Sequence, residues 1–310
     1  MGLRNVTELT TTDYSSRIGN VEFIWARNSK EFLFSNSVLI HGKRPIIVDP
    51  SASFTYIENL AKAHYVHTVF NTHYHGDHRS LNQLFKGVVF ASHELDALPI
   101  SNHQEYARVS DKDPNSYYSQ WTLEVFQKYK IVECPVAVKL KDGDILDSDG
   151  EHARLIHIPG HTPGHVALYF EDIDLLYTSD IDLTPYGPWY ANIVSDLEDF
   201  KASVKKVRTF ECAHYVTSHG ERIYDREKFL EKMDRYEAHF ANRDERILET
   251  IKAEPCDMAT LCSQGIIYKQ VALTDPLKCY FQYQMIEKHI DALIRQKLIT
   301  KDEEKLVLMR

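Results

Sequence analysis

The residues with the clearest chemical potential lie in one short segment, His73–His78, which holds three imidazoles and one carboxylate. In an extended segment, residues two apart project to the same side, so His73 and His75 are expected to face one point. Asp77 and His78 follow where a helix is expected to begin, and they approach that point from another direction. Imidazoles and carboxylates together suit zinc, iron or manganese. The spacing therefore predicts a metal site with ligands from two directions, as two neighbouring ions require.

Three further candidate ligands, His161, Asp180 and His219, stand much later in the chain. Each follows a short apolar segment that is expected to be a strand, and each lies in or beside a turn with glycine, proline or serine. Loops at strand ends commonly carry the functional residues of a rigid scaffold. Tight turns also fix the direction of the side chain that they hold. We therefore expect these three residues to complete the metal site.

The elements that must position these residues alternate between strand and helix. Helical spacing occurs at 57–64 and 200–210. The predicted strands are short and apolar, and they lie at 21–26, 37–41, 45–48, 66–71, 137–140, 154–158, 166–170, 175–178 and 215–217. This alternation favours an α/β layered fold.

Two regions differ from this pattern. Residues 94–133 are polar, rich in tyrosine and helical in spacing. They are interpreted either as surface helices with a small core of their own or as an insertion that covers a pocket. The C-terminal region combines two helices with two short strands, at 226–253, 280–296, 298–299 and 305–309. We therefore expect a catalytic domain over residues 1–235 and a winged-helix-like domain over residues 236–310.

The motifs taken together resemble the metallo-β-lactamase superfamily, in its glyoxalase II-like branch. The resemblance rests on HxHxDH at 73–78, PGHTPGH at 159–165, Ser179-Asp180 and Ser218-His219-Gly220, in this order along the chain. It implies a four-layer αββα sandwich with the site at one edge of the sheets. It also implies two ligand sets joined by a bridging carboxylate: His73, His75 and His161 for the first metal, Asp77, His78 and His219 for the second, and Asp180 for both. On pattern and placement alone, the C-terminal region resembles the winged-helix tail of lactamase-β-like proteins, some of which are endoribonucleases.

The chain also departs from several branches of that superfamily. His75-Gly76-Asp77 replaces the His-x-Glu-x-Asp arrangement of flavodiiron oxygen reductases. All the ligands of the second metal are present, unlike in the mononuclear persulfide dioxygenases. Asp180 stands where the class B β-lactamases have a cysteine, so antibiotic hydrolysis is not the expected native role.

Two divalent ions would define the chemistry, with zinc favoured and iron or manganese as alternatives. Ions roughly 3.5–4 Å apart can share one water and lower its pKa toward about 7, which gives a bridging hydroxide at neutral pH. The same ions polarise the carbonyl or phosphoryl oxygen under attack. Asp77, as a hydrogen-bond partner of the hydroxide, and Asp180, as the bridge, are the candidate catalytic residues. The centre fits hydrolysis of an ester, a thioester, a lactone or a phosphodiester.

Several side chains near the predicted ligands are candidates for a substrate pocket. They are Tyr117, Tyr118 and Trp121 of the insertion, Tyr186, Trp189 and Tyr190 after Asp180, and His165. The alternative interpretation is that the aromatic side chains pack against the core and that His165 is an ordinary residue at the start of a strand. If they line the site, the substrate is a small molecule with an apolar portion.

Charge argues against a nucleic-acid partner. The whole chain has a net charge of −9, and residues 236–310 hold 11 basic and 12 acidic residues. A nucleic-acid binder needs several basic phosphate contacts. A small-molecule substrate is therefore expected, with an endoribonuclease, or a regulatory protein that keeps the metal site, as alternatives.

The remaining features concern location and assembly. No apolar run approaches the roughly 18 residues of a membrane span, and the first 14 residues lack the apolar core of a signal peptide. The five cysteines are far apart, which indicates reduced thiols. We therefore expect a cytoplasmic protein without a membrane partner, and a homodimer is left open.

Overall fold

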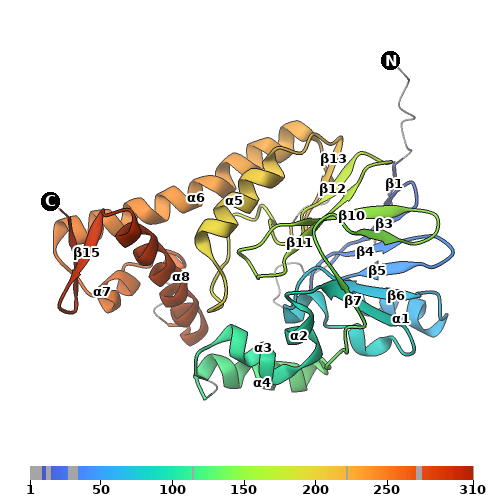
Figure 1. Ribbon diagram of the computed structural model, residues 1–310, viewed down its shortest axis with the longest axis horizontal. Coiled ribbons are helices and arrows are strands. Elements are labelled where there is room, and N and C mark those ends of the chain that lie inside the picture. The colour runs from blue at the N-terminus through green and yellow to red at the C-terminus, as the bar shows by residue number, and fades with distance from the viewer. Residues whose placement is uncertain are drawn as a thin grey trace.

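Two β-sheets form the centre of the molecule in the computed structural model (Figure 1), which describes residues 9–11, 15–26, 34–113, 115–220, 223–269 and 274–309. The first sheet contains β1 (Leu9–Thr11), β2 (Ser15–Ile18), β3 (Val21–Ile24), β4 (Ser37–Ile40), β5 (Ile46–Val48), β6 (Thr68–Asn71), β7 (Val89–His93) and β8 (Val138–Leu140), in this order. The second contains β14 (Ile223–Tyr224), β13 (His214–Val216), β12 (Leu175–Tyr177), β11 (Val166–Phe170), β10 (His152–His157) and β9 (Ile145–Asp147).

Strand direction determines where the functional loops meet. The neighbours from β5 to β8 are parallel, so the loops that follow β5, β6 and β7 emerge at one edge of the first sheet. In the second sheet β12 and β13 are parallel. Strand β10 runs in the same direction, because β11 is antiparallel to both β10 and β12. The segments after these three strands therefore also emerge together.

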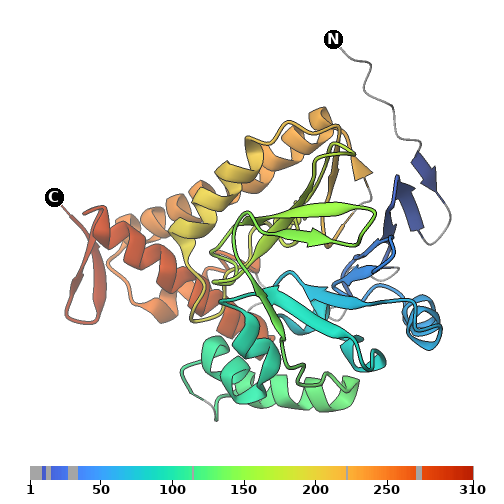
Figure 2. The same cartoon turned by 45° about the vertical axis from the view of Figure 1, so that its right-hand side comes forward.

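The sheets pack face to face, and helices cover both outer faces (Figure 2). Adjacent residues of a strand point to opposite faces. Val38 accordingly joins the core between the sheets, whereas Leu39 packs with Ile57 of α1 (Phe54–Lys62) on the outer face of the first sheet. On the outer face of the second sheet lie α5 (Leu197–Arg208) and the first half of α6 (Arg226–Ala253). The four-layer αββα sandwich is thereby confirmed.

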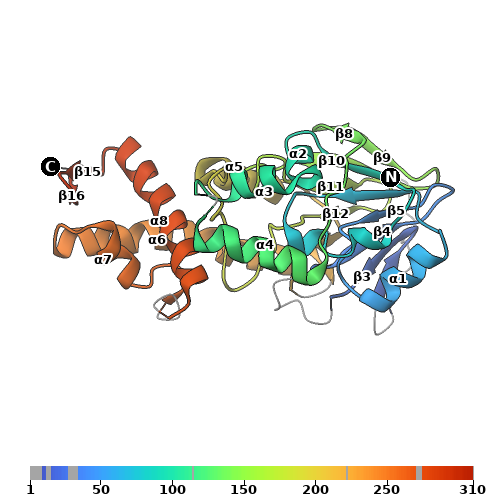
Figure 3. The ribbon, with the colours of Figure 1, turned by 90° about the horizontal axis from the view of Figure 1, so that it is seen from below.

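Residues 94–133 form the helices α2 (Ala97–Ser101), α3 (His103–Ser110) and α4 (Tyr117–Tyr129). They share a small core, in which Tyr106 and Phe126 pack with Tyr74 from the predicted ligand segment. Helix α4 also contacts α8 (Pro276–Arg295), as the view from below shows (Figure 3). The insertion therefore has a core of its own and joins the C-terminal region to the rest of the chain.

The C-terminal region has the element order expected of a winged helix. After α6 come α7 (Met258–Ser263), α8 and a hairpin of β15 (Ile299–Asp302) and β16 (Lys305–Leu308). The predicted boundary between residues 235 and 236 lies inside α6, which is one continuous helix of 28 residues. Its first half packs on the second sheet and its second half packs within the C-terminal core. No helix in the described ranges combines the length and apolarity that a membrane span needs.

Candidate metal centre

All seven predicted ligands meet at the edge where the strand ends converge. The donor atoms of His73, His75, His161 and Asp180 lie within 4.8 Å of one another, and so do those of Asp77, His78 and His219. The first segment follows β6, and the other ligands follow β10, β12 and β13. The helix expected from Asp77 is only a single 3-10 turn, Gly76–His78. It ends before Arg79, whose backbone is not helical and whose buried side chain donates to backbone oxygens of Ile100 and Val132.

Asp180 lies between the two groups and faces each with a different oxygen. Its Oδ2 lies 3.1 Å from Nε2 of His161 and 3.8 Å from Nε2 of His73. Its Oδ1 lies 3.0 Å from Nε2 of His78 and 3.6 Å from Nε2 of His219. Ser218 donates a hydrogen bond to the same Oδ1. This is the placement that a carboxylate needs to bind two cations at once.

In the first group, neighbouring groups fix which ring nitrogen carries the proton. His161 donates from Nδ1 to the backbone oxygen of Trp189 at 2.8 Å. His73 Nδ1 lies 3.1 Å from Oγ1 of Thr72, whose own proton goes to Asp49. Both Nε2 atoms are therefore bare, yet they lie only 3.3 Å apart. Converging lone pairs repel one another unless a cation lies between them.

The second group shows the same arrangement. His78 donates from Nδ1 to Oδ2 of the buried Asp49 at 2.9 Å. Its buried Nε2 lies 3.0 Å from Oδ1 of Asp180 and 3.8 Å from Oδ2 of Asp77. This nitrogen therefore points to the same place as two carboxylates, which is the arrangement of donor atoms that a cation requires. The donor sets of both groups therefore fit divalent cations.

The two groups differ in electrostatics. Burial and the neighbouring His78 lower the pKa of His73 well below its usual value. Burial alone would also lower the pKa of His219, but the carboxylates of Asp180 and Asp77 raise it to about 9. His73 and His75, whose pKa values are both lowered, thus offer neutral nitrogens, whereas a cation entering the second group must displace protons.

Three residues that sequence reasoning missed hold the ligands in place. Asp49 orients His78, as described above. Asp96 is buried, which raises its pKa to about 6, and it accepts hydrogen bonds from Thr162 Oγ1 and from the backbone nitrogens of Gly164 and Tyr74. Asn192 is buried with its side-chain amide 2.7 Å from Nε2 of His75. Asp49 and Asp96 follow the strands β5 and β7, which pair in parallel with β6 on either side. An acidic residue after a strand next to the one that carries the ligand segment was the signal available in the sequence.

The candidate pocket residues occupy very different environments. Trp189 packs edge-to-face against His75 and His161, with ring centroids 5.3 and 5.7 Å apart. Tyr118 is buried and stacks near Trp121, and Tyr190 is buried against Phe240. The side chains of Tyr117 and Tyr186 are 59% and 78% exposed.

His165 is fully buried. Its Nδ1 donates to the backbone oxygen of Ile158, and its Nε2 accepts from the backbone nitrogen of Asp180. The structure thus places His165 where it holds the backbone of Asp180.

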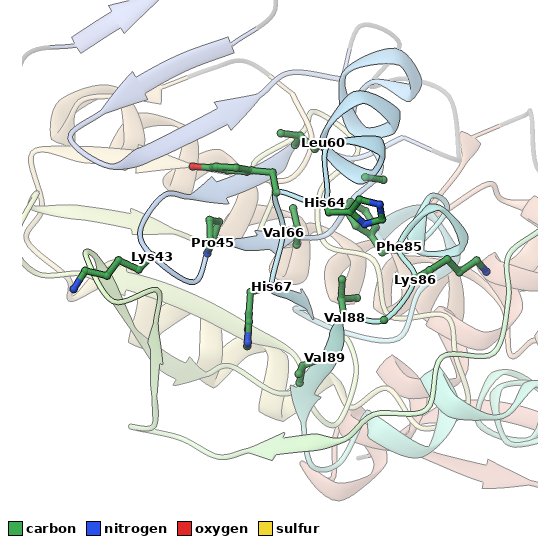
Figure 4. Close-up of a pocket in the computed structure, with 13 residues that line it drawn as sticks. Lys43, Pro45, Leu60, His64, Val66, His67, Phe85, Lys86, Val88 and Val89 are labelled. Atoms are coloured by element: carbon green, nitrogen blue, oxygen red, sulfur yellow. The ribbon is translucent and has the colours of Figure 1, made fainter.

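A separate cleft of about 340 Å³ lies at the opposite edge of the first sheet (Figure 4). Pro45, His67 and Val88 line it, and they precede β5, β6 and β7. Because these strands are parallel, their amino ends lie away from the metal centre. The cleft therefore belongs to another face of the molecule.

Comparison with known proteins agrees with this geometry. The sequence profile described as the metallo-beta-lactamase superfamily matches residues 31–219. A beta-lactamase-like protein 2 homolog from Caenorhabditis elegans is 24% identical over 219 residues, which are 70% of this chain and 62% of that protein. A hydroxyacylglutathione hydrolase from Yersinia pestis is 29% identical over 128 residues, or 41% of this chain and 39% of that protein. The match thus spans less than two thirds of either relative.

Solved structures show the same fold. A metallo-beta-lactamase family protein from Thermus thermophilus superposes with a TM-score of 0.67 at 20% sequence identity. The superposition covers 88% of this chain and 93% of that protein, so the similarity of fold extends beyond the profile match into the C-terminal region.

Proposed function

Because the chain belongs to the metallo-beta-lactamase superfamily, we propose that it is a dinuclear metal-dependent hydrolase of a small ester, thioester or lactone with an apolar portion. The observation that carries this proposal is the position of Asp180. One of its oxygens faces the histidines of the first group and the other faces those of the second. A bridge of this kind is needed only where two cations lie side by side.

Two divalent cations in this centre, zinc being the favoured pair, would supply a nucleophilic hydroxide near neutral pH and polarise the substrate carbonyl. The side chains of His73 and His78 are completely buried, whereas those of Asp77, Asp180 and His219 are 13%, 11% and 15% exposed. Substrate therefore approaches over the second group. Oδ2 of Asp77 lies 3.3 Å from Nε2 of His219 at this open side, where it would accept a hydrogen bond from the hydroxide.

The apolar portion of the substrate is inferred from the aromatic side chains beside the first group. Trp189 contacts two ligand rings, and Phe281 of α8 packs edge-to-face against it with centroids 5.3 Å apart. Burial of apolar groups against such a surface favours binding by about 0.8 kcal/mol per methylene. The Yersinia relative, whose name gives an acyl compound as its substrate, also favours acyl-bond cleavage.

The test is a panel of acyl esters, acyl thioesters and lactones of increasing acyl length, together with a short unstructured RNA at low salt. We expect metal-dependent cleavage of acyl substrates, with kcat/KM rising roughly fourfold per methylene, and loss of turnover in Asp180→Ala. Trp189→Ala is the matched control variant. It should weaken the dependence of kcat/KM on acyl length while both ions stay bound. Asp180-dependent cleavage of RNA alone would favour the endoribonuclease. No turnover with both ions bound would favour a regulatory protein.

A further inference from the structure

We propose that Arg243, on α6, is a positioning residue for the first metal group. It fixes the segment 186–192, whose Trp189 and Asn192 orient two of the three histidines of that group. The proposal rests on the dinuclear function proposed above. It gives the C-terminal region an indirect part in metal binding, through this segment.

Arg243 holds this segment through hydrogen bonds from its guanidinium group. Its side chain is almost fully buried, and Nη1 donates to the backbone oxygen of Pro188 at 2.8 Å and to Tyr190 Oη at 2.7 Å. Nη2 donates to the backbone oxygen of Tyr186 at 3.1 Å. Residues 181–196 contain no helix or strand, so sheet or helix hydrogen bonds do not hold this backbone. The guanidinium supplies two hydrogen bonds to this backbone and a third to the side chain of Tyr190.

The second step is a directed chain of hydrogen bonds behind Tyr190. His289 donates from Nδ1 to Oδ1 of Asp244 at 2.6 Å, and burial lowers the pKa of this imidazole. Its Nε2 is therefore an acceptor, and it receives the proton of Tyr190 Oη at 2.7 Å. Because Tyr190 Oη donates its proton to His289, it acts as the acceptor in its hydrogen bond with Arg243. Helices α6 and α8 thus hold the segment from both sides.

The third step connects the segment to the ligands. The backbone oxygen of Trp189 accepts from Nδ1 of His161, which fixes the tautomer that leaves Nε2 bare. The side chain of Asn192 contacts both Nε2 of His75 and Oη of Tyr74 at 2.7 Å. Nδ1 of His75 faces Nε2 of His73 at 2.9 Å, on the side of the first group. Asn192 holds the opposite side of this ring through Nδ2, and its Oδ1 accepts a hydrogen bond from Oη of Tyr118 at 3.3 Å.

A lysine cannot replace this arginine, because a single ammonium group lacks the planar fork that reaches three acceptors. Arg243→Lys should therefore loosen the segment while it keeps the charge. Loss of residues that orient metal ligands typically weakens metal affinity by about 10–100-fold. We expect a loss of this size at the first group and less than a threefold change at the second, because Asp77, His78 and His219 do not contact the segment in the bonds described above.

The experiment compares Arg243→Lys with Arg246→Lys. Arg246 lies on the same helix and also donates to backbone oxygens, those of Gln264, Gly265 and Ile266 in the C-terminal region. Stepwise cadmium titration followed by NMR would separate the groups, because the first offers three imidazoles and the second two. We expect weakened binding at the first group in Arg243→Lys and unchanged binding at both in Arg246→Lys. Asn192→Leu should reproduce the Arg243→Lys pattern.

Thermal unfolding of the metal-free variants separates folding from positioning. Equal affinities in wild type and Arg243→Lys, equal losses at both groups, or the same losses in both arginine variants would overturn the positioning role. Wild-type protein that binds only one ion would instead overturn the dinuclear function.

Discussion

Replacement of Asp49 by asparagine should disable the second metal group while leaving the first intact. Asp49 is fully buried. Its Oδ1 accepts from the backbone nitrogen of Thr72 at 2.8 Å, and its Oδ2 accepts from Thr72 Oγ1 at 2.7 Å and from His78 Nδ1 at 2.9 Å. Its φ of 48° lies in the left-handed region, which asparagine tolerates. The substitution therefore changes charge and hydrogen bonding without adding backbone strain.

The direction of the effect follows from the donors around Asp49. The backbone nitrogen of Thr72 can only donate, so the amide oxygen of Asn must replace Oδ1 and its NH2 group must replace Oδ2. Thr72 can adapt, because its hydroxyl lies 2.8 Å from Ser179 Oγ and can donate there. His78 can accept from the amide only by moving its proton to Nε2, which blocks the atom that would bind metal.

The expected loss is about 10–100-fold in affinity at the second group, or about 1.4–2.8 kcal/mol. Equilibrium dialysis against buffered zinc, followed by elemental analysis, should give two ions per chain for wild type and one for Asp49→Asn. Asp182→Asn is the control, because Asp182 Oδ1 accepts from Thr184 in its own turn. Retention of two ions with wild-type affinity by Asp49→Asn would refute the tautomer argument.

Three other outcomes are expected. Asp180→Ala should lower kcat/KM by roughly 100-fold or more, since it removes a ligand of both ions rather than a residue that only orients a ligand. Circular dichroism should show an intact fold. Near-normal turnover with both ions bound would exclude Asp180 as the bridge. Burial alone would raise the pKa of Glu22, but hydrogen bonds from His41, Ser15 and Tyr56 lower it from 4.5 to about 2. The ionised form therefore stabilises the fold above pH 4.5, by at most about 3 kcal/mol, and urea unfolding of metal-free Glu22→Gln should show a deficit at pH 6 that shrinks as the pH falls from 4.5 toward 2. A deficit independent of pH would contradict this. Gly160→Ala should cost about 2–4 kcal/mol of unfolding free energy, because φ is +117° and the new Cβ would lie 2.2 Å from the backbone nitrogen of Phe200; thermal melting at wild-type temperature would show that the loop relaxes freely.

The features that were predictable from the sequence are determined by residues close to one another in the chain. The bounds of α6 follow from its apolar spacing and from Asp225, whose side chain accepts from the backbone nitrogen of Lys228 and begins the helix. The ligand segment His73–His78 is recognisable because its spacing is itself the chemical signal. Strand β2, Ser15–Ile18, was missed because it has only one large apolar residue, Ile18, and takes its place by pairing with β3.

The parts that were not predictable depend on contacts between distant segments. Asp49 meets His78 across 29 positions, and Asn192 meets His75 across 117. The aromatic side chains after Asp180 lie in an irregular loop. Without the periodicity of a helix or strand, the sequence does not indicate which way each of these side chains points. Trp189 therefore contacts ligand histidines, while Tyr186, three residues earlier, is exposed to solvent.

The continuity of α6 has a consequence for cooperativity. A helix of 28 residues is about 42 Å long, and here its two halves belong to different cores. Tyr236, near the middle, donates from Oη to the backbone oxygen of Asp180. Fraying of α6 that starts in the C-terminal core would thus extend along one hydrogen-bonded helix to the residue that contacts the backbone of Asp180. The sandwich and the C-terminal region should therefore unfold as one unit, and a cut between residues 235 and 236 would leave neither fragment with a complete core.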